Sequence, residues 1–377
     1  MHASPLAPLL LEKRVVVVAG AGGVGKTTVS AALALSAASR GRRVLCLTID
    51  PAKRLFDRLG LNAESEAEQV LDPAPFAREG LELPGELTIM MLDTKRTFDD
   101  LVRRHAADAA GAERILHNEF YEYVSTQLAG TQAYMAMEKV LAVLDDDHFD
   151  LVVLDTPPTS DALDFLDAPE RLVEVVDSAA LRWLAEAFDK GGRLSLNLVA
   201  RGVAMLLKGM ARLTGRGFLE RLAEFVSELN QLFGGFKERA QRVAAAFRDP
   251  DFAYLLVATG SRPTLNDAAY FAERLERLGM RADGLIVNRV LPRGGSEPEL
   301  TEVQAALGSS ADLAERVLAA YRAEIALAEL EQRTTTQFSS GGGPLGRDRL
   351  SIHVEVPAFP ESVHDVAALT AVARRFV

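Results

Sequence analysis

The sequence predicts an α/β protein with a doubly wound, mostly parallel sheet and an inserted helical subdomain. Short apolar runs rich in β-branched residues alternate with helical patterns along most of the chain, a glycine-rich loop follows the first run directly, and one long stretch lacks any strand signal. Alternation of strands and helices is the pattern of parallel sheets covered on both faces. The 377 residues are enough for one large α/β domain or two ordinary ones.

The first predicted strand covers Arg14–Ala19, where the valines from Val15 to Val18 are unbroken, as in strands buried on both faces. After the glycine loop, Thr27–Arg40 is rich in Ala and Leu with helical periodicity, and Gly41 lies where a C-cap is expected. Further strands are predicted at Arg43–Thr48, Leu87–Leu92, Leu151–Leu154, Ala253–Ala258, Gly284–Val287 and Ile352–Val356.

The chain is predicted to divide into three segments. Residues 1–168 form the first part of the core and include a helical stretch at about 94–147, whereas residues 169–249 read as a helical insertion. Residues 250–377 complete the core. Within this last segment, Thr334–Arg347 is expected to be a flexible loop, because consecutive serines and glycines follow residue 338.

The composition of the chain bears on its partners, its cysteine chemistry and its location in the cell. A net charge of −11 argues against broad nucleic-acid binding, and no nucleic-acid partner is expected. The single cysteine, Cys46, excludes an intrachain disulfide, and its mid-strand position favours a buried inert thiol. No run of about 18 uncharged apolar residues occurs, and Met1–Arg14 makes a poor signal peptide, so we expect a cytoplasmic protein.

The glycine-rich loop Gly20–Thr27 matches the G-x-x-x-x-G-K-[ST] motif, with a strand before it and a helix after it. In such a loop the backbone N–H groups cradle phosphates, aided by the helix N-terminus. Lys26 would neutralise β- and γ-phosphate charge, and the Thr27 hydroxyl would ligate Mg²⁺. The predicted nucleotide-binding residues here are Gly20, Gly22, Gly23, Val24, Gly25, Lys26, Thr27 and Thr28.

Two acidic residues end predicted strands and are candidates for the chemistry. Asp155 follows Leu151–Leu154, where a Walker-B acid would organise Mg²⁺ through water; the alternative is a helix-capping aspartate. Asp50 ends the second strand and could orient the water that attacks the γ-phosphate. It could equally cap a helix that begins at Pro51, and the two roles are compatible.

Several motifs together resemble the arsenite-pump and guided-entry ATPase family, which belongs to the SIMIBI class of P-loop NTPases. They are Gly-Gly-Val-Gly-Lys-Thr-Thr at 22–28, a deviant Walker A, Thr-Ile-Asp-Pro-Ala at 48–52 and Asp-Thr-Pro-Pro-Thr at 155–159. The resemblance implies a dimeric ATPase that uses ATP and Mg²⁺, with Asp50 as the water-orienting residue of switch I and residues 155–159 as switch II. It also implies that Asn288 reads adenine and that Pro357 lines the other side of the base.

The sequence departs from the family pattern in three ways. Ala21 occupies the position of a lysine that reaches across the dimer to the partner's phosphates, so hydrolysis by this chain alone is expected to be slow. One cysteine is too few for metalloid binding, and the Cys-x-x-Cys clasp of the guided-entry branch is absent. We therefore expect either a homodimer or a heterodimer with a paralogue.

The segment Lys190–Leu219 contains no acidic residue but has six basic ones and a wide apolar face. Three interpretations remain open: a groove for an apolar helix of a protein client, a helix in peripheral contact with a membrane, or a helix buried in the insertion or at a dimer interface. The amphipathic segment Glu361–Val377 could bind a membrane, but packing against the sheet is favoured.

The sequence thus predicts an ATPase that couples nucleotide-driven dimer closure to the binding of a hydrophobic protein client. Two alternatives are kept. One is a positioning ATPase that acts on a membrane or a nucleoid, and the other is a weakly active nucleotide-binding subunit paired with a lysine-bearing paralogue.

Overall fold

The structure is a computed structural model that describes most of the chain. The described residues are 4–49, 68–106, 108–118, 120–122, 125, 131–157, 225, 239, 241–292, 297–308, 311–359, 363 and 365–377. They divide into two compact units, one built from residues 1–91, 147–163 and 250–377, and the other from residues 92–146 and 164–249.

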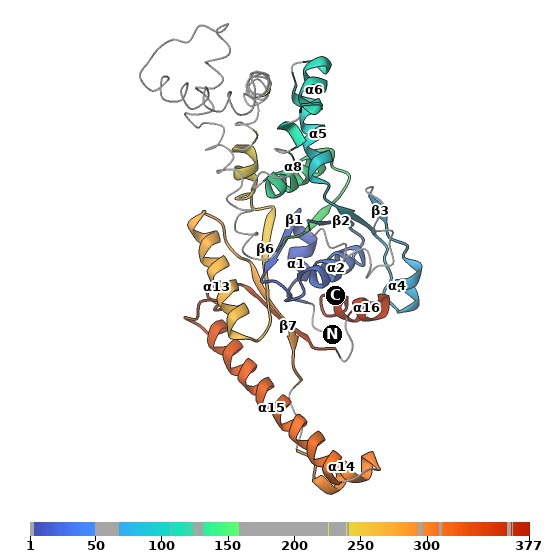
Figure 1. The fold of residues 1–377 in the computed structure, drawn as a ribbon, viewed down its shortest axis with the longest axis vertical. Coiled ribbons are helices and arrows are strands. Elements are labelled where there is room, and N and C mark those ends of the chain that lie inside the picture. Colours follow the sequence, from blue (N-terminus) through green and yellow to red (C-terminus); the bar gives the residue numbers. More distant parts are fainter. Residues whose placement is uncertain are drawn as a thin grey trace, which may run out of the picture. The chain divides into compact units, whose positions relative to one another are not determined.

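An eight-stranded sheet forms the centre of the first unit, with strand order β3-β4-β2-β5-β1-β6-β7-β8 (Figure 1). All neighbouring strands are parallel except β3, which runs antiparallel to β4 at the edge. The strands are β1 (Val15–Gly20), β2 (Arg43–Thr48), β3 (Gln69–Val70), β4 (Glu86–Met91), β5 (Leu151–Asp155), β6 (Phe252–Ala258), β7 (Gly284–Val290) and β8 (Ile352–Pro357).

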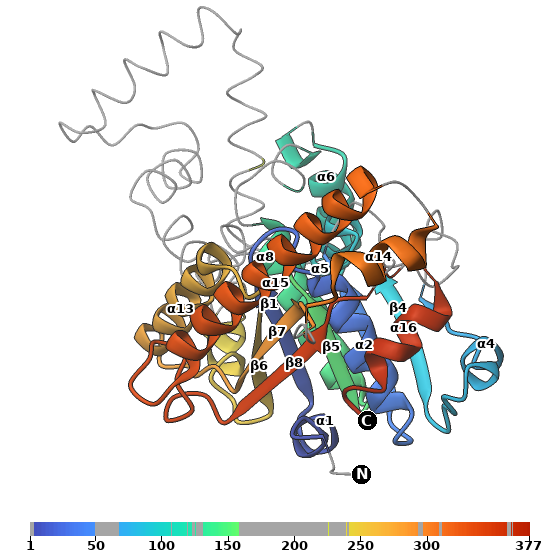
Figure 2. The same cartoon turned by 90° about the horizontal axis from the view of Figure 1, so that it is seen from below.

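Helices cover both faces of the sheet. On one side α2 packs on β1, β2, β4 and β5, with α1 and α16 against it, and on the other α13 packs on β1 and β6 (Figures 1 and 2). The described helices of this unit are α1 (Ala7–Glu12), α2 (Lys26–Ala38), α4 (Ala74–Arg78), α13 (Arg262–Arg277), α14 (Leu300–Leu307), α15 (Ala311–Ser339) and α16 (Val366–Ala373). The predicted doubly wound fold is confirmed.

Burial in the core explains why the central strands and α2 form where they do. Every residue of β1, β5 and β6 is buried, as expected for central parallel strands covered by helices on both faces. In α2, alanine and leucine dominate, and nearly the whole helix is buried, so small side chains allow it to lie close to the sheet. Seven strands agree with the predicted runs, whereas β3 escaped prediction because its two residues carry no periodic signal.

The prediction of a flexible loop at Thr334–Arg347 is wrong in its first part, because α15 continues through Ser339. Thr334 and Phe338 lie one turn apart and are buried, so packing outweighs the weak helix propensity of three consecutive threonines. Turns begin only at Ser340. The prediction that Glu361–Val377 packs against the sheet is not met in that form: α16 packs mainly on the helices α2 and α4, and Leu369 and Phe376 are fully buried.

The second unit is helical where it is described, and contains α5 (Thr94–His105), α6 (Ala109–Leu116) and α8 (Thr131–Asp146). In this unit, the buried carboxylate of Glu138 on α8 binds Arg239 at 2.5 Å and accepts a hydrogen bond from the Tyr134 hydroxyl. Nearly all of the predicted insertion at 169–249, including Lys190–Leu219, lies outside the described residues. Among the described helices, none combines the length and apolarity that a membrane crossing requires.

Candidate nucleotide-binding site

The glycine-rich loop connects the end of β1 to the start of α2 at the middle of the sheet. Gly20 approaches β6 so closely that a Cβ atom would lie 2.2 Å from the carbonyl oxygen of Val257, which excludes any larger residue. Gly25 is the N-cap of α2 and has φ of +97°, a left-handed conformation that glycine adopts without strain. The predicted strand–loop–helix context is therefore present, with helix N–H groups at the loop.

Lys26 is buried at the first position of α2, and its ammonium group points back to the loop. Its Nζ donates hydrogen bonds to the carbonyl oxygens of Gly20 at 3.0 Å and Ala21 at 3.1 Å. A charged amine beside two loop carbonyl groups is placed to meet a phosphate bound in the same loop. The Ala21 side chain is buried within the hydrophobic core.

Asp155 is fully buried at the carboxyl end of β5 and accepts hydrogen bonds from three hydroxyl groups. Thr27 donates at 2.8 Å, Thr48 at 3.1 Å and Ser30 at 3.3 Å. The carboxylate is thus held by the first turn of α2 and by the end of β2, whose Thr48 is the register partner of Asp155. This arrangement brings together Thr27 and Asp155, the two residues that the sequence predicts to bind Mg²⁺.

Ser30 and Thr48 were missed by the sequence analysis. A usable signal existed for each: Ser30 lies three residues after Thr27 on the same helix face, and Thr48 ends the strand that precedes Asp50. Thr156 adds a further tie, because its hydroxyl donates to the Val18 carbonyl oxygen at 2.8 Å and fixes the end of β5 to β1.

Asn288 lies near the end of β7 and contacts the loop directly. Its side-chain Nδ2 donates to the Val24 carbonyl oxygen at 2.8 Å, and a Cβ atom on Gly25 would lie 2.3 Å from the same nitrogen. The strand is irregular just beyond it, with Arg289 in a left-handed conformation. Asn288 is therefore buried against the loop, while Pro357 ends β8 as the register partner of Val290.

Part of the predicted site lies outside the described residues. Asp50 lies outside the described residues, as do Pro158 and Thr159 of the predicted switch II. Thr28 is described and buried. Cys46 is fully buried in β2 as predicted, and burial raises the pKa of its thiol well above the ordinary value, with a smaller contribution from Asp155.

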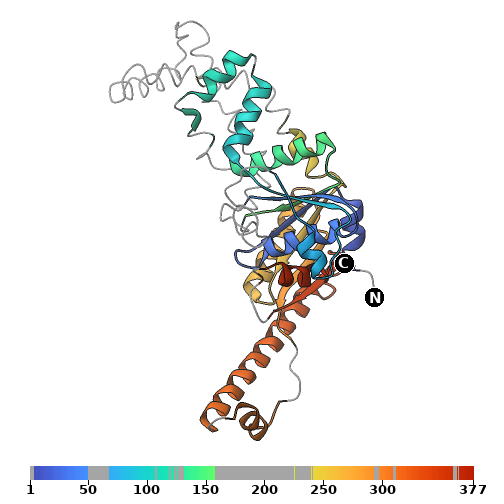
Figure 3. The same ribbon diagram turned by 90° about the vertical axis from the view of Figure 1, so that its right-hand side faces the viewer.

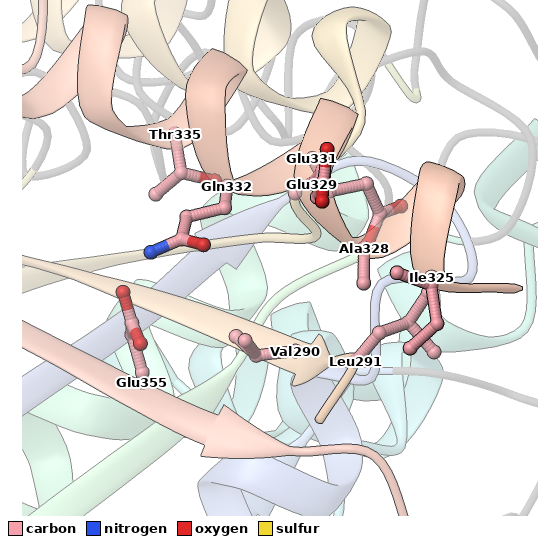
Figure 4. Close-up of a pocket in the computed structure, with 10 residues that line it drawn as sticks. Val290, Leu291, Ile325, Ala328, Glu329, Glu331, Gln332, Thr335 and Glu355 are labelled. Atoms are coloured by element: carbon pink, nitrogen blue, oxygen red, sulfur yellow. The ribbon is translucent and has the colours of Figure 1, made fainter. Parts of the chain in front are cut away.

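A cavity of about 310 Å³ lies elsewhere, between α15 and the carboxyl ends of β6, β7 and β8. Figure 4 shows Glu331 and Gln332 on α15 above Glu355 of β8, with Val290 and Leu291 at the end of β7. None of the loop residues Gly20–Thr27 lines this cavity.

Within the described part of the chain, no group of three or more His, Cys, Asp or Glu side chains could hold a metal. Mg²⁺ at nucleotide sites is generally bound by few protein ligands together with substrate phosphates. Thr27 and Asp155 supply a hydroxyl and a carboxylate within 2.8 Å of each other, which are oxygen groups of the kind that Mg²⁺ prefers.

Comparison with known proteins agrees with the resemblance seen in the sequence. The family model described as anion-transporting ATPase matches residues 13–322. The chain is 27% identical to ATPase get3 of Aspergillus terreus over 287 residues, which is 75% of each chain. It is 24% identical to ATPase GET3C of Arabidopsis thaliana over 301 residues, 78% of this chain and 71% of the relative, and 26% identical to ATPase GET3 of Chaetomium globosum over 287 residues, 76% of each. The chain therefore belongs to the anion-transporting ATPase (ArsA) family.

Proposed function

We propose that the chain hydrolyses ATP at the Gly20–Thr27 loop. The observation that carries the proposal is the convergence of Lys26, Thr27 and Asp155 at the carboxyl ends of β1 and β5. Ligands of open α/β sheets bind outside the carboxyl ends of the strands. Asn288, buried against the loop, would then meet the base, and Pro357 would lie on its other side.

The chain's own groups would bind and orient the substrate. Lys26 would exchange the loop carbonyl groups for phosphate oxygens, and Thr27 and Asp155 would hold Mg²⁺, directly and through water respectively. When bound, the metal supplies charge neutralisation on the β- and γ-phosphates. Asp50 would orient the attacking water, in keeping with its place in the sequence two residues after Thr48 and with the family resemblance.

The test separates binding from turnover. Asp50→Asn is expected to abolish phosphate release while leaving the affinity for ATP nearly intact, whereas Lys26→Ala is expected to weaken ATP binding itself. The measurements are phosphate release and calorimetric titration with ATP. If Asp50→Asn loses binding to the same extent as Lys26→Ala, the water-orienting role of Asp50 is wrong.

We further propose that turnover depends on a dimer and is slow for this chain alone. Ala21 carries no charge and is buried, so this loop cannot supply a cation to a partner's phosphates. A cation of that kind is worth several orders of magnitude in rate. Purified protein that hydrolyses ATP as fast as relatives with the lysine would contradict this proposal, and co-purification would reveal a lysine-bearing paralogue.

We propose a hydrophobic protein client for the ATPase cycle. Support comes from the acid-free apolar segment Lys190–Leu219 and from family membership. Deleting Leu194–Leu213 is expected to abolish client co-purification while leaving ATP binding intact. Client binding that survives the deletion would exclude this segment, and dependence of hydrolysis on vesicles or DNA instead of an apolar peptide would favour a positioning ATPase.

A further inference from the structure

Helix α15 carries an exposed apolar stripe. Together with α14 it extends beyond the edge of the sheet as a helical hairpin (Figures 1 and 3). Four large members of the stripe are between 40% and 61% exposed, and two alanines between them are exposed as well. The stripe consists of Leu313, Val317, Ala320, Ala323, Leu327 and Leu330.

Neither α14 nor the sheet covers this stripe. Ala314 and Leu318 are buried, and each follows a stripe residue by one position, so their side chains point about 100° away around the helix. The contacts of α15 with α14, α13 and β7 are therefore made on other sides of the helix. Within the described part of the chain, the stripe faces solvent.

The pattern of the stripe is self-complementary. Read in either direction it runs two large, two small and two large residues, centred between Ala320 and Ala323. A two-fold contact requires a patch in which residue i meets j while j meets i. In an antiparallel pair, Leu313 would face Leu330 of the second copy, and Ala320 would face Ala323 of that copy. The alanines at the centre allow close approach of the helices.

We propose that α15 pairs antiparallel with α15 of a second copy of this chain through the stripe. Charge supports this occupant, because the register places Asp312 beside Arg333 of the second copy on both sides of the two-fold axis, as at flanking positions of antiparallel coiled coils. Arg333 is 79% exposed, and it pairs with Glu329 one turn earlier on the same helix at 3.2 Å. Arg316, which lies within the stripe region, can cover the partner's Leu327 with its aliphatic stem.

The contact is small. The stripe spans 18 residues and thus about 27 Å of helix, so one helix pair buries less than the roughly 1,600 Å² of a standard interface. We therefore expect weak, concentration-dependent association that salt weakens further. The inference deepens the dimer of the proposed function, but it concerns a surface away from the loop and does not require nucleotide.

A charge exchange tests the arrangement. Asp312→Arg and Arg333→Asp chains each place like charges opposite each other when paired with themselves, whereas a mixture of the two restores both pairs. Sedimentation velocity over a concentration series, without nucleotide, should show weakened self-association of each variant and recovery in the equimolar mixture. The Asp312→Arg/Arg333→Asp double variant should associate like the original chain.

Cysteine cross-linking gives a second measurement, since the natural Cys46 is buried and will not interfere. Under mild oxidation a mixture of Ala320→Cys and Ala323→Cys chains should cross-link faster than either variant alone. A chain that stays monomeric at all concentrations, or a mixture that fails to recover, would overturn the proposal. The proposal would also be overturned if the original chain is monomeric and the Leu327→Glu/Leu330→Glu variant loses binding to vesicles or to an apolar peptide. Phosphate release, measured in parallel, reports separately on the proposed ATPase activity.

Discussion

Replacing Asn288 by alanine tests whether this residue acts on the loop as well as on the base. The substitution removes the 2.8 Å hydrogen bond to the Val24 carbonyl oxygen at a buried position. A buried carbonyl group that loses its partner costs about 1–3 kcal/mol. If that cost falls on the loop conformation that binds phosphate, affinity drops by about fivefold to 150-fold. Asn288→Asp should be worse, because a carboxylate would face the carbonyl oxygen.

The assay compares a ligand with a base and one without it. Calorimetric titration with ADP and with tripolyphosphate should show weaker binding of both to Asn288→Ala, because the loop cradles phosphates in each case. Asn266→Ala is the matched control, since Asn266 is exposed on α13 and far from the loop in sequence. Unchanged tripolyphosphate binding beside weakened ADP binding would refute a loop role and leave base recognition alone. Tighter tripolyphosphate binding would show that the contact competes with the ligand.

Three further predictions concern stability and reactivity. Arg239→Ala should destabilise the helical unit by about 3–5 kcal/mol in urea unfolding, because it leaves Glu138 buried without its cation. The control Arg242→Ala, which breaks an exposed ion pair, should cost less than about 1 kcal/mol. Equal costs for the two variants would contradict this. Cys46 should react with a thiol reagent no faster than the protein unfolds, even at pH 9, because burial raises its pKa; rapid labelling of the native protein would contradict this. Asp150→Asn should lower the melting temperature at pH 7, because hydrogen bonds from a neighbouring arginine lower the pKa of the Asp150 carboxyl in the folded state. The difference in melting temperature from the original chain should shrink as the pH falls below about 4, since protonation of the carboxylate removes this stabilisation. A difference that does not change with pH would contradict this.

The parallel sheet was predictable because its signals are local. Val15–Val18 is a continuous β-branched run, and a strand buried on both faces needs such a run. The loop motif then fixes where α2 begins, since its glycines and Lys26 are contiguous in sequence. Both inferences depend on neighbouring residues alone, so no knowledge of tertiary packing was required.

Features set by tertiary contacts were not predictable in the same way. Serines and glycines after residue 338 suggested a loop from Thr334, but burial of Phe338 extends the helix to Ser339. Likewise, the hydroxyl of Thr48 reaches Asp155 only because β2 and β5 are neighbours in the sheet, 107 residues apart in sequence. Strand order is not encoded in any local pattern, so this contact became visible only in the structure.

The hydrogen bonds of the loop lead us to infer how nucleotide affinity must arise. Lys26 already donates to two loop carbonyl groups, and Thr27 already donates to Asp155. A bound phosphate would therefore replace existing partners of these groups, and the exchange of one hydrogen bond for another contributes only about 0.5–1.5 kcal/mol net. Most of the affinity must then come from placing phosphate charge beside a buried ammonium group and helix N–H groups, where the low dielectric strengthens attraction. The placement of the charge matters as well, because Lys26 is buried and its Nζ contacts two loop carbonyl groups at once. Lys26→Arg keeps the charge but introduces a larger group at this buried position, so it should lose binding nearly as fully as Lys26→Ala. Retention of affinity in the arginine variant would show that charge alone suffices.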